Sequence, residues 1–106
     1  MADNGFVITN ELVEGGATRF IVKGRVNSIS APVLKHKLEE AIQHGEHVNL
    51  ILNMTQVEYL SSNGISTILS IYKQAEEAGG KFGIEEPSEV VRNVLGMTAL
   101  DKMLIV

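Results

Sequence analysis

Two adjacent serines, Ser61 and Ser62, occupy the point where an apolar strand is expected to give way to an amphipathic helix. The start of a helix leaves backbone N–H groups unpaired and carries a partial positive charge. A serine hydroxyl there can cap the helix, and a phosphate there can accept hydrogen bonds from the same N–H groups. Gly64 follows and has no Cβ, which predicts an uncrowded approach for a kinase. Taken alone, the two serines indicate most simply a cap; the order of the surrounding elements favours Ser62 as a phosphate acceptor.

No other set of residues has the spacing of a catalytic or metal site. The three histidines are expected to lie apart from any convergent carboxylates: they are His36, His44 and His47. The glutamates within 85–89 are interpreted as a solvated face, because catalytic carboxylates need burial or a shared proton. A hydrolase elbow, a Walker loop, a dinucleotide-binding glycine pattern and cysteine are all missing from the sequence. The sequence therefore predicts no enzyme, no metal and no other cofactor.

Length and composition predict one compact domain. The chain has 106 residues, of which 44% are hydrophobic, and its formal net charge is −4. It has no tryptophan and no run of basic residues to attract a phosphate backbone, so a nucleic-acid partner is not expected. No apolar run could span a bilayer, and residues 1–5 lack the features of a signal peptide. Together with the absence of cysteine, these features predict a cytoplasmic protein without direct membrane insertion.

Strand patterns occur in four places. Residues 6–12 and 17–24 flank a glycine-containing turn and indicate an antiparallel hairpin. Residues 48–52 are almost wholly apolar, which is typical of a central strand, and residues 81–85 indicate a further one. The apolar residues 104–106 are compatible with a last short strand.

Helical patterns alternate with these strands. The first helix is expected from a cap at Ser30 to Gly45, the second over 63–78, and the third from Pro87 to Gly96. In the second, the apolar spacing predicts a buried stripe: it comprises Ile65, Ile68, Leu69 and Tyr72. Polar residues are expected on the opposite side: Asn63, Thr67, Ser70 and Gln74. Ile71 is expected on the flank, where it either touches a partner or packs under a neighbouring element. The order β-β-α-β-α-β-α predicts an α/β fold with helical crossovers.

Four stretches follow one recognisable pattern: residues 22–27, 50–60, 61–65 and 72–81. The first resembles hydrophobic-x-Gly-Glu-Leu-Asp after a second strand, and the third resembles Asp-Ser-Ser/Thr-Gly-Leu at the start of a helix. With this order of elements the chain resembles the STAS domain family, which includes bacterial anti-sigma-factor antagonists and the cytoplasmic part of sulphate transporters. The resemblance implies a single STAS domain over residues 1–106. It also implies a mixed β-sheet with an N-terminal hairpin and three main helices packed mostly on one face.

The resemblance also implies a function. In antagonists of this family the serine two positions before the glycine accepts phosphate, which assigns that role to Ser62 and leaves Ser61 as a secondary candidate. The implied partners are a serine-kinase anti-sigma factor, whose binding frees the sigma factor, and a serine phosphatase that reverses the modification. The expected partner-binding residues surround the junction: Asn27, Ser61, Asn63, Gly64, Thr67 and Ile71.

The chain departs from the family pattern in places. Ser61 and Asn27 stand where the family has aspartates, and Ser66 stands where it has a second glycine. The loss of two carboxylates favours an alternative: a STAS scaffold that is not switched, or a small cytosolic subunit of a membrane transport assembly. A small enzyme or nucleotide binder on a doubly wound sheet is a third hypothesis, which the missing phosphate loop disfavours.

Overall fold

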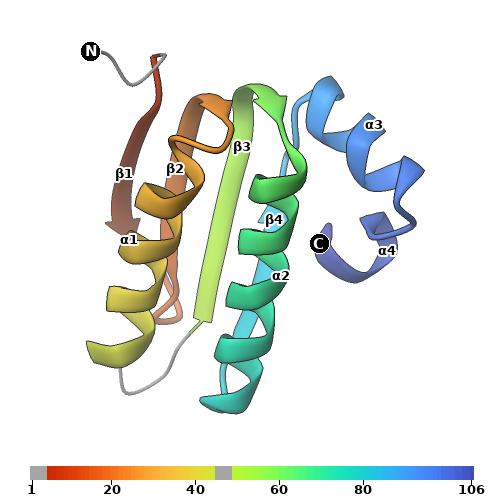
Figure 1. Ribbon diagram of the computed structural model, residues 1–106. Coiled ribbons are helices and arrows are strands. Elements are labelled where there is room, and N and C mark those ends of the chain that lie inside the picture. The colour runs from red at the N-terminus through yellow and green to blue at the C-terminus, as the bar shows by residue number, and fades with distance from the viewer. Residues whose placement is uncertain (1–4, 45–48) are drawn as a thin grey trace.

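The structure, a computed structural model, describes residues 5–44 and 49–106 (Figure 1). Its strands are β1 (Val7–Leu12), β2 (Thr18–Val26), β3 (Asn49–Leu60) and β4 (Lys81–Glu85). Its helices are α1 (Ala31–His44), α2 (Ser62–Glu77), α3 (Glu89–Met97) and α4 (Asp101–Leu104). The predicted order of elements is confirmed within these residues. Some predictions fall outside the described part, which lacks residues 1–4 and 45–48. These are the end of the first helix at Gly45, the position of His47 and the start of the third strand at Val48.

The four strands form one mixed sheet in the order β1-β2-β3-β4. β1 pairs antiparallel with β2, as the hairpin pattern predicted, and β2–β3 and β3–β4 are parallel pairs. The crossover helices α1 and α2 lie side by side over one face of the sheet, while α3 and α4 lie beyond β4 (Figure 1). The α/β class is therefore confirmed. None of the helices in the described residues combines the length and apolarity needed to cross a bilayer.

The strand β3 is much longer than its apolar run. The predicted end at Leu52 is wrong, because pairing with β2 continues to Leu60. Two irregularities in the register interrupt the alternation of buried and exposed residues after Met54. Bulges leave extra residues unpaired and disrupt the period of two, so the strand's second half looks like a loop in the sequence. The bulges carry β3 directly to the serine pair.

The chain ends differently from the predicted strand over 104–106. Asp101–Leu104 form the short helix α4, and only Ile105 makes an isolated parallel bridge, to Ile84. The backbone N–H of Val106 donates to Ile84 O at 3.0 Å. A three-residue apolar run does not distinguish a strand from the last turn of a helix, so the sequence could not decide between them.

The core lies between the sheet and the two crossover helices. Every second residue of β3 up to Met54 points into it: Leu50, Leu52 and Met54. Leu34 and Leu38 of α1 are fully buried in the same core. Burying each such side chain stabilises the fold by about 1.5–3 kcal/mol, so this layer fixes where the strand ends and helix starts lie.

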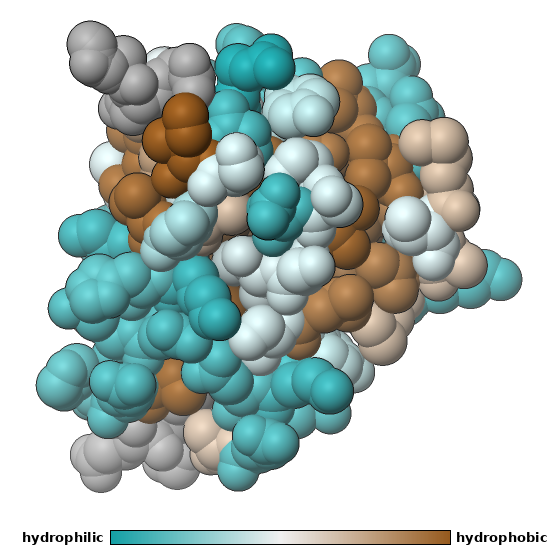
Figure 2. All heavy atoms as spheres, in the orientation of Figure 1, coloured by the Kyte–Doolittle hydropathy of each residue, from teal (hydrophilic) through white to brown (hydrophobic). Residues whose placement is uncertain are grey.

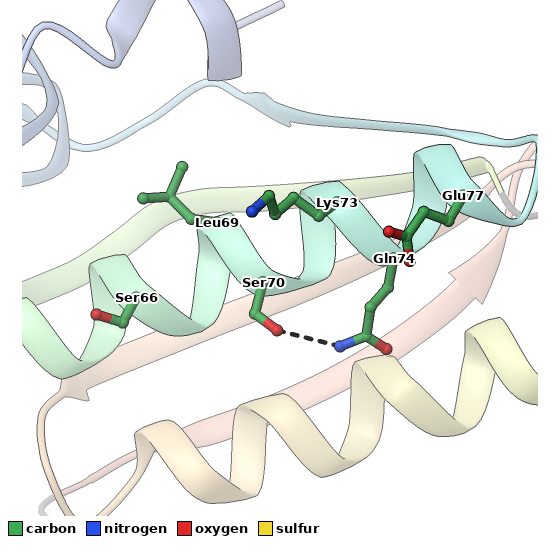
Figure 3. Close-up of a pocket in the computed structure, with 6 residues that line it drawn as sticks. All are labelled: Ser66, Leu69, Ser70, Lys73, Gln74 and Glu77. Carbon is green, nitrogen blue, oxygen red and sulfur yellow. Dashed lines mark hydrogen bonds between the residues drawn. The ribbon is translucent and has the colours of Figure 1, made fainter.

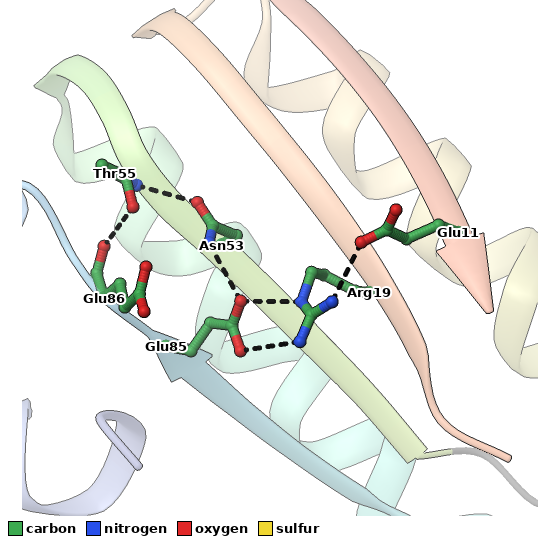
Figure 4. Close-up of polar contacts among 6 residues, drawn as sticks. All are labelled: Glu11, Arg19, Asn53, Thr55, Glu85 and Glu86. Atoms are coloured by element: carbon green, nitrogen blue, oxygen red, sulfur yellow. Dashed lines mark hydrogen bonds and ion pairs between the residues drawn. The ribbon is translucent and has the colours of Figure 1, made fainter. Parts of the chain in front are cut away.

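The opposite face of the sheet carries a polar network (Figure 4). Arg19 donates from Nε to Glu85 at 2.7 Å and from Nη1 to Glu11 at 2.9 Å. Asn53 Nδ2 donates to the same Glu85 carboxylate at 2.9 Å. The network ties β1, β2, β3 and β4 together. The hydrogen bond from Asn53, then the bond and charge of Arg19, hold the pKa of Glu85 below its ordinary value of 4.5 against the opposing effect of burial.

The lowered pKa of Glu85 predicts an acid-sensitive contribution to stability. A carboxylate whose pKa is lower in the folded than in the unfolded state stabilises the fold fully above its unfolded pKa. That contribution is lost as pH falls through the lowered pKa, so the loss lies below about pH 4.5. In urea denaturation from pH 7 to pH 3, Glu85→Gln should flatten the fall in stability. Glu86→Gln, whose carboxylate lies outside the network in Figure 4, should keep the wild-type slope; equal slopes in all three proteins would contradict the prediction.

Candidate functional site

The candidate site is the junction between β3 and α2. β3 ends at Leu60 and α2 begins at Ser62, so one residue, Ser61, makes the turn. Its extended backbone (φ −88°, ψ 173°) is that of an N-cap, and its Oγ accepts a hydrogen bond from the N–H of Gly64 at 3.2 Å. Its own N–H donates to Val26 O at the end of β2, at 2.9 Å. Ser61 is therefore held in place as the cap between two strand ends and the helix.

Ser62 occupies a different environment from its neighbour. It is the first residue of α2, its side chain is exposed, and its hydroxyl makes no hydrogen bond with any described residue. Gly64 N–H is taken by the cap, whereas the N–H groups of Ser62 and Asn63 have no partner inside the helix. An accessible hydroxyl next to free amides and the positive end of a helix dipole suits the attachment of an anionic group.

Gly64 is buried, which corrects its predicted role. A Cβ at this position would lie 2.6 Å from Leu60 Cδ1 and 2.8 Å from Val26 Cγ1. The missing Cβ therefore serves the close packing of the first turn of α2 against the two strand ends, not the approach of a kinase. Gly64 is covered by these neighbours, so it is not available for the predicted contact with a partner.

Asn27 lies next to Val26, and so beside the junction, as expected. Its Oδ1 accepts from Ile29 N–H at 3.0 Å and from Ser30 N–H at 3.1 Å. The hydroxyl of Ser30 donates to Arg25 O at 2.6 Å and accepts from Asn27 N–H. Ser30 directly precedes α1, as predicted, and its C=O accepts from Leu34 N–H, but its buried hydroxyl bonds the turn and not a helix N–H. Asn27 thus shapes the β2–α1 turn, and its half-buried amide remains at the edge of the site.

Thr67 and Ile71 correct the predicted orientation of α2. Ile71 is fully buried and Thr67 is 8% exposed, so neither side chain lies on a surface that a partner could reach. The buried face of α2 comprises Gly64, Thr67, Ile68, Ile71 and Ala75. The stripe predicted from apolar residue types is therefore displaced from the buried face. Three of its members are only partly buried: Ile65, Leu69 and Tyr72. The helix packs against α1 as well as against β3 and β4, so its buried face is set by more than one neighbouring element.

The outer face of α2 is left exposed below Ser62. Ser66 lies one turn further along, and a shallow hollow of about 500 Å³ follows the same helix down to Glu77. All the residues that line it come from α2 (Figure 3), and Gln74 in it donates to Ser70 at 3.1 Å and to Glu39 of α1 at 2.9 Å. Apolar side chains gather between α2 and α3 (Figure 2). The surface around Ser62 is therefore polar along α2 and apolar toward α3.

The histidines and acids of residues 5–44 and 49–106 do not form a metal-binding arrangement. No group of three such side chains that could hold a metal ion occurs there. His36 and His44 are exposed on α1, and His36 Nε2 lies 3.5 Å from the carboxylate of Glu40 on the same helix. Glu85, from the acidic cluster, belongs to the network of Figure 4 and lies on the sheet face opposite the helices. The chemistry that the junction offers is that of a hydroxyl at a helix start.

The cap at Ser61 can be tested by itself. Ser61→Ala should lower the free energy of unfolding by about 1 kcal/mol, because the N–H of Gly64 loses its acceptor. Ser61→Asp should keep or raise stability, since a carboxylate caps well and interacts favourably with the helix dipole. Chemical denaturation of the three proteins measures both effects. Equal stability of Ser61→Ala and wild type would contradict the role of Ser61 as the cap.

Comparison with known protein families agrees with this geometry. A family model described as the STAS domain matches residues 12–106. The chain belongs to the STAS domain family. The anti-sigma F factor antagonist of Paenibacillus polymyxa is 23% identical over 83 residues, which cover 78% of this chain and 71% of that protein. The anti-sigma-B factor antagonist of Bacillus subtilis (strain 168) is 26% identical over 83 residues, covering 78% and 74%.

Solved STAS structures share the fold. The anti-sigma factor antagonist SpoIIAA in its unphosphorylated form superposes with a TM-score of 0.81 at 20% identity, covering 93% of this chain and 86% of that one. An anti-sigma factor antagonist from Mycobacterium paratuberculosis gives 0.80 at 22% identity, covering 97% and 86%. At this identity the likeness establishes the fold alone. Both comparisons confirm the STAS fold that the four sequence stretches indicated.

Proposed function

We propose that this protein is an anti-sigma-factor antagonist whose binding is switched off by phosphorylation of Ser62. In this proposal the unphosphorylated chain binds a serine-kinase anti-sigma factor and frees the sigma factor. The kinase then modifies Ser62, and a serine phosphatase restores the binding form. The chain itself acts by binding and not as an enzyme. Similarity to proteins named anti-sigma factor antagonists supports the choice of partner.

The observation that carries the proposal is the difference between the two serines. The Ser61 hydroxyl is engaged as the helix cap, whereas the Ser62 hydroxyl is exposed and has no hydrogen bond within the described chain. A kinase that reaches this junction therefore meets one free hydroxyl. The same contrast makes Ser61 the less accessible acceptor, because its side chain is half-buried and its hydroxyl is engaged by the N–H of Gly64.

Phosphate on Ser62 would act through charge at the interface. It adds about −1.5 to −2 charge at pH 7, at a helix start where such charge is tolerated. The helix α2 therefore stays folded, and the change lies on the surface that the partner must approach. A phosphate forced against apolar or acidic partner groups costs several kcal/mol, which corresponds to a loss of affinity of about a hundredfold or more.

The replacement of the family's aspartates by Ser61 and Asn27 favours a second candidate, an unswitched STAS scaffold or transporter subunit. Ser61 caps α2 and Asn27 holds the β2–α1 turn, so both positions keep a structural role without a carboxylate. The geometry of the junction thus remains suited to modification although the charges are gone. For that reason we favour the switched antagonist.

A displacement assay tests the proposed function. The unphosphorylated chain is added to complexes of each serine-kinase anti-sigma factor with its sigma factor, all encoded in the same genome as the chain. Size-exclusion chromatography should detect free sigma factor and a new complex of the chain with one kinase. Displacement from none of them, or co-purification with a membrane transport protein instead, would contradict the antagonist.

A further inference from the structure

The open face of the sheet carries a row of basic side chains on β2. Arg19, Lys23 and Arg25 alternate with the buried residues of this strand and so point away from α1 and α2. Arg19 is neutralised by Glu11 and Glu85. Lys23 and Arg25 are exposed, and neither forms an ion pair with a described residue. Two uncompensated cations thus remain at the end of β2, on a protein whose formal net charge is −4.

Arg25 is held in place by an aromatic ring. Its guanidinium carbon lies 4.5 Å above the centroid of the Tyr59 ring, and the register pairs the two residues directly across β2 and β3. Tyr59 is 40% exposed although β3 is an interior strand of the sheet. Stacking on an aromatic ring fixes the guanidinium and leaves its edge donors free for a carboxylate. Arginine and tyrosine are also enriched among the residues that dominate binding energy at protein interfaces.

This pair adjoins the candidate site. Val26 follows Arg25 and accepts the hydrogen bond from Ser61 N–H, so the two strand ends are joined one residue from the pair. Tyr59 precedes Ser62 by three positions along the same chain. A partner that covers Ser62 can therefore reach over the strand ends and contact the pair. Glu58, which directly precedes Tyr59, makes no ion pair with Arg25 among the described residues.

We propose that Arg25 stacked on Tyr59, together with Lys23, docks an acidic segment of the serine-kinase anti-sigma factor. The inference rests on the proposed function and adds the charge that the partner must carry. Carboxylates accept two parallel hydrogen bonds from a guanidinium, and opposite charges speed the encounter of the two proteins. The basic element would thus select a kinase with an acidic surface beside its active-site cleft.

The test measures the affinity of the kinase for charge variants by calorimetry in the absence of ATP. Arg25→Glu should weaken binding about tenfold to a hundredfold, because a like charge then faces the acidic segment. Arg25→Lys should retain most of the affinity. Lys81→Glu is the matched control, because Lys81 is also an exposed basic residue of the sheet but lies at the start of β4, at the opposite end of the parallel strands. It should bind like wild type.

Tyr59 gives an independent readout. Tyr59→Ala should weaken binding about threefold to tenfold, and Tyr59→Phe should not, since the ring face is what holds the arginine. Raising the salt concentration should weaken the wild type more than Arg25→Glu. If the wild type binds the kinase and Arg25→Glu binds it with equal affinity, the docking element is overturned but the proposed function is not. Failure of the wild type to bind any serine-kinase anti-sigma factor would overturn the proposed function and this element with it.

Discussion

Ser62→Asp is expected to weaken binding to the serine-kinase anti-sigma factor strongly, whereas Ser62→Ala is expected to keep it. Ser62 is exposed at the first position of α2, so neither variant disturbs the core or the cap at Ser61. The aspartate places a fixed negative charge where the proposal puts the phosphate, and the alanine removes only a hydroxyl. The loss should be about a hundredfold or more in Kd. Calorimetric titration of each variant with the kinase measures it.

An aspartate introduced away from the junction serves as the control, because it shows whether the loss of binding depends on the position of the charge. Asn10→Asp adds the same charge at an exposed residue of β1 that pairs with Phe20, away from the ends of β2 and β3, and it should bind like wild type. Thermal unfolding should give Ser62→Asp a stability equal to or above that of wild type, because an acid at a helix start is favourable. Equal binding by the alanine and aspartate variants would argue against a switch based on charge.

Gly64→Ala is expected to lower stability and to weaken partner binding together. Its Cβ would lie within 3 Å of both Leu60 Cδ1 and Val26 Cγ1, in a packed part of the core. Overpacking of this kind costs about 1–3 kcal/mol, which the better helix propensity of alanine offsets by about 1 kcal/mol. The net loss should be up to about 2 kcal/mol in urea denaturation. Because the first turn of α2 must shift, Ser62 moves with it.

Gly96 supplies the control for helix propensity. It lies in α3, and a Cβ there would meet nothing within 4 Å. Gly96→Ala should therefore raise stability by about 0.5–1 kcal/mol. Gly64→Ala should cost less in a Val26→Ala background, where one of its two close neighbours has been removed. A Gly64→Ala protein as stable as Gly96→Ala would contradict the packing role.

The fold could be predicted from the sequence wherever one period governs a whole element. The hairpin 6–24, β4 and α1 follow their apolar patterns, and the element order was enough for the α/β class. The second half of β3 could not be predicted, because two bulges break its alternation. The orientation of α2 was missed for another reason: the helix packs against α1, β3 and β4 together, and the sequence of one helix does not contain those contacts.

The candidate site was predicted in its centre and not in its surroundings. The serine pair and Asn27 are placed together by Val26 and the junction. Gly64, Thr67 and Ile71 belong to the core, and only a three-dimensional packing could reveal that. Arg25 and Tyr59 were missed, although the basic row on β2 is visible as Arg19, Lys23 and Arg25 at alternate positions. The sequence does not show that Tyr59 pairs with Arg25, because two bulges in β3 shift the register before Tyr59.

Mapping of the phosphate tests the central claim most directly. The chain is incubated with ATP and the serine-kinase anti-sigma factor that it binds, and the modified residue is located by mass spectrometry. One phosphate per chain on Ser62, with none on Ser61, and dissociation of the modified chain from the kinase are the predicted results. Ser62→Ala should remain unmodified and bound. An unmodified wild-type chain, a phosphate on Ser61 alone, or a phosphorylated chain that stays in the complex would contradict the account.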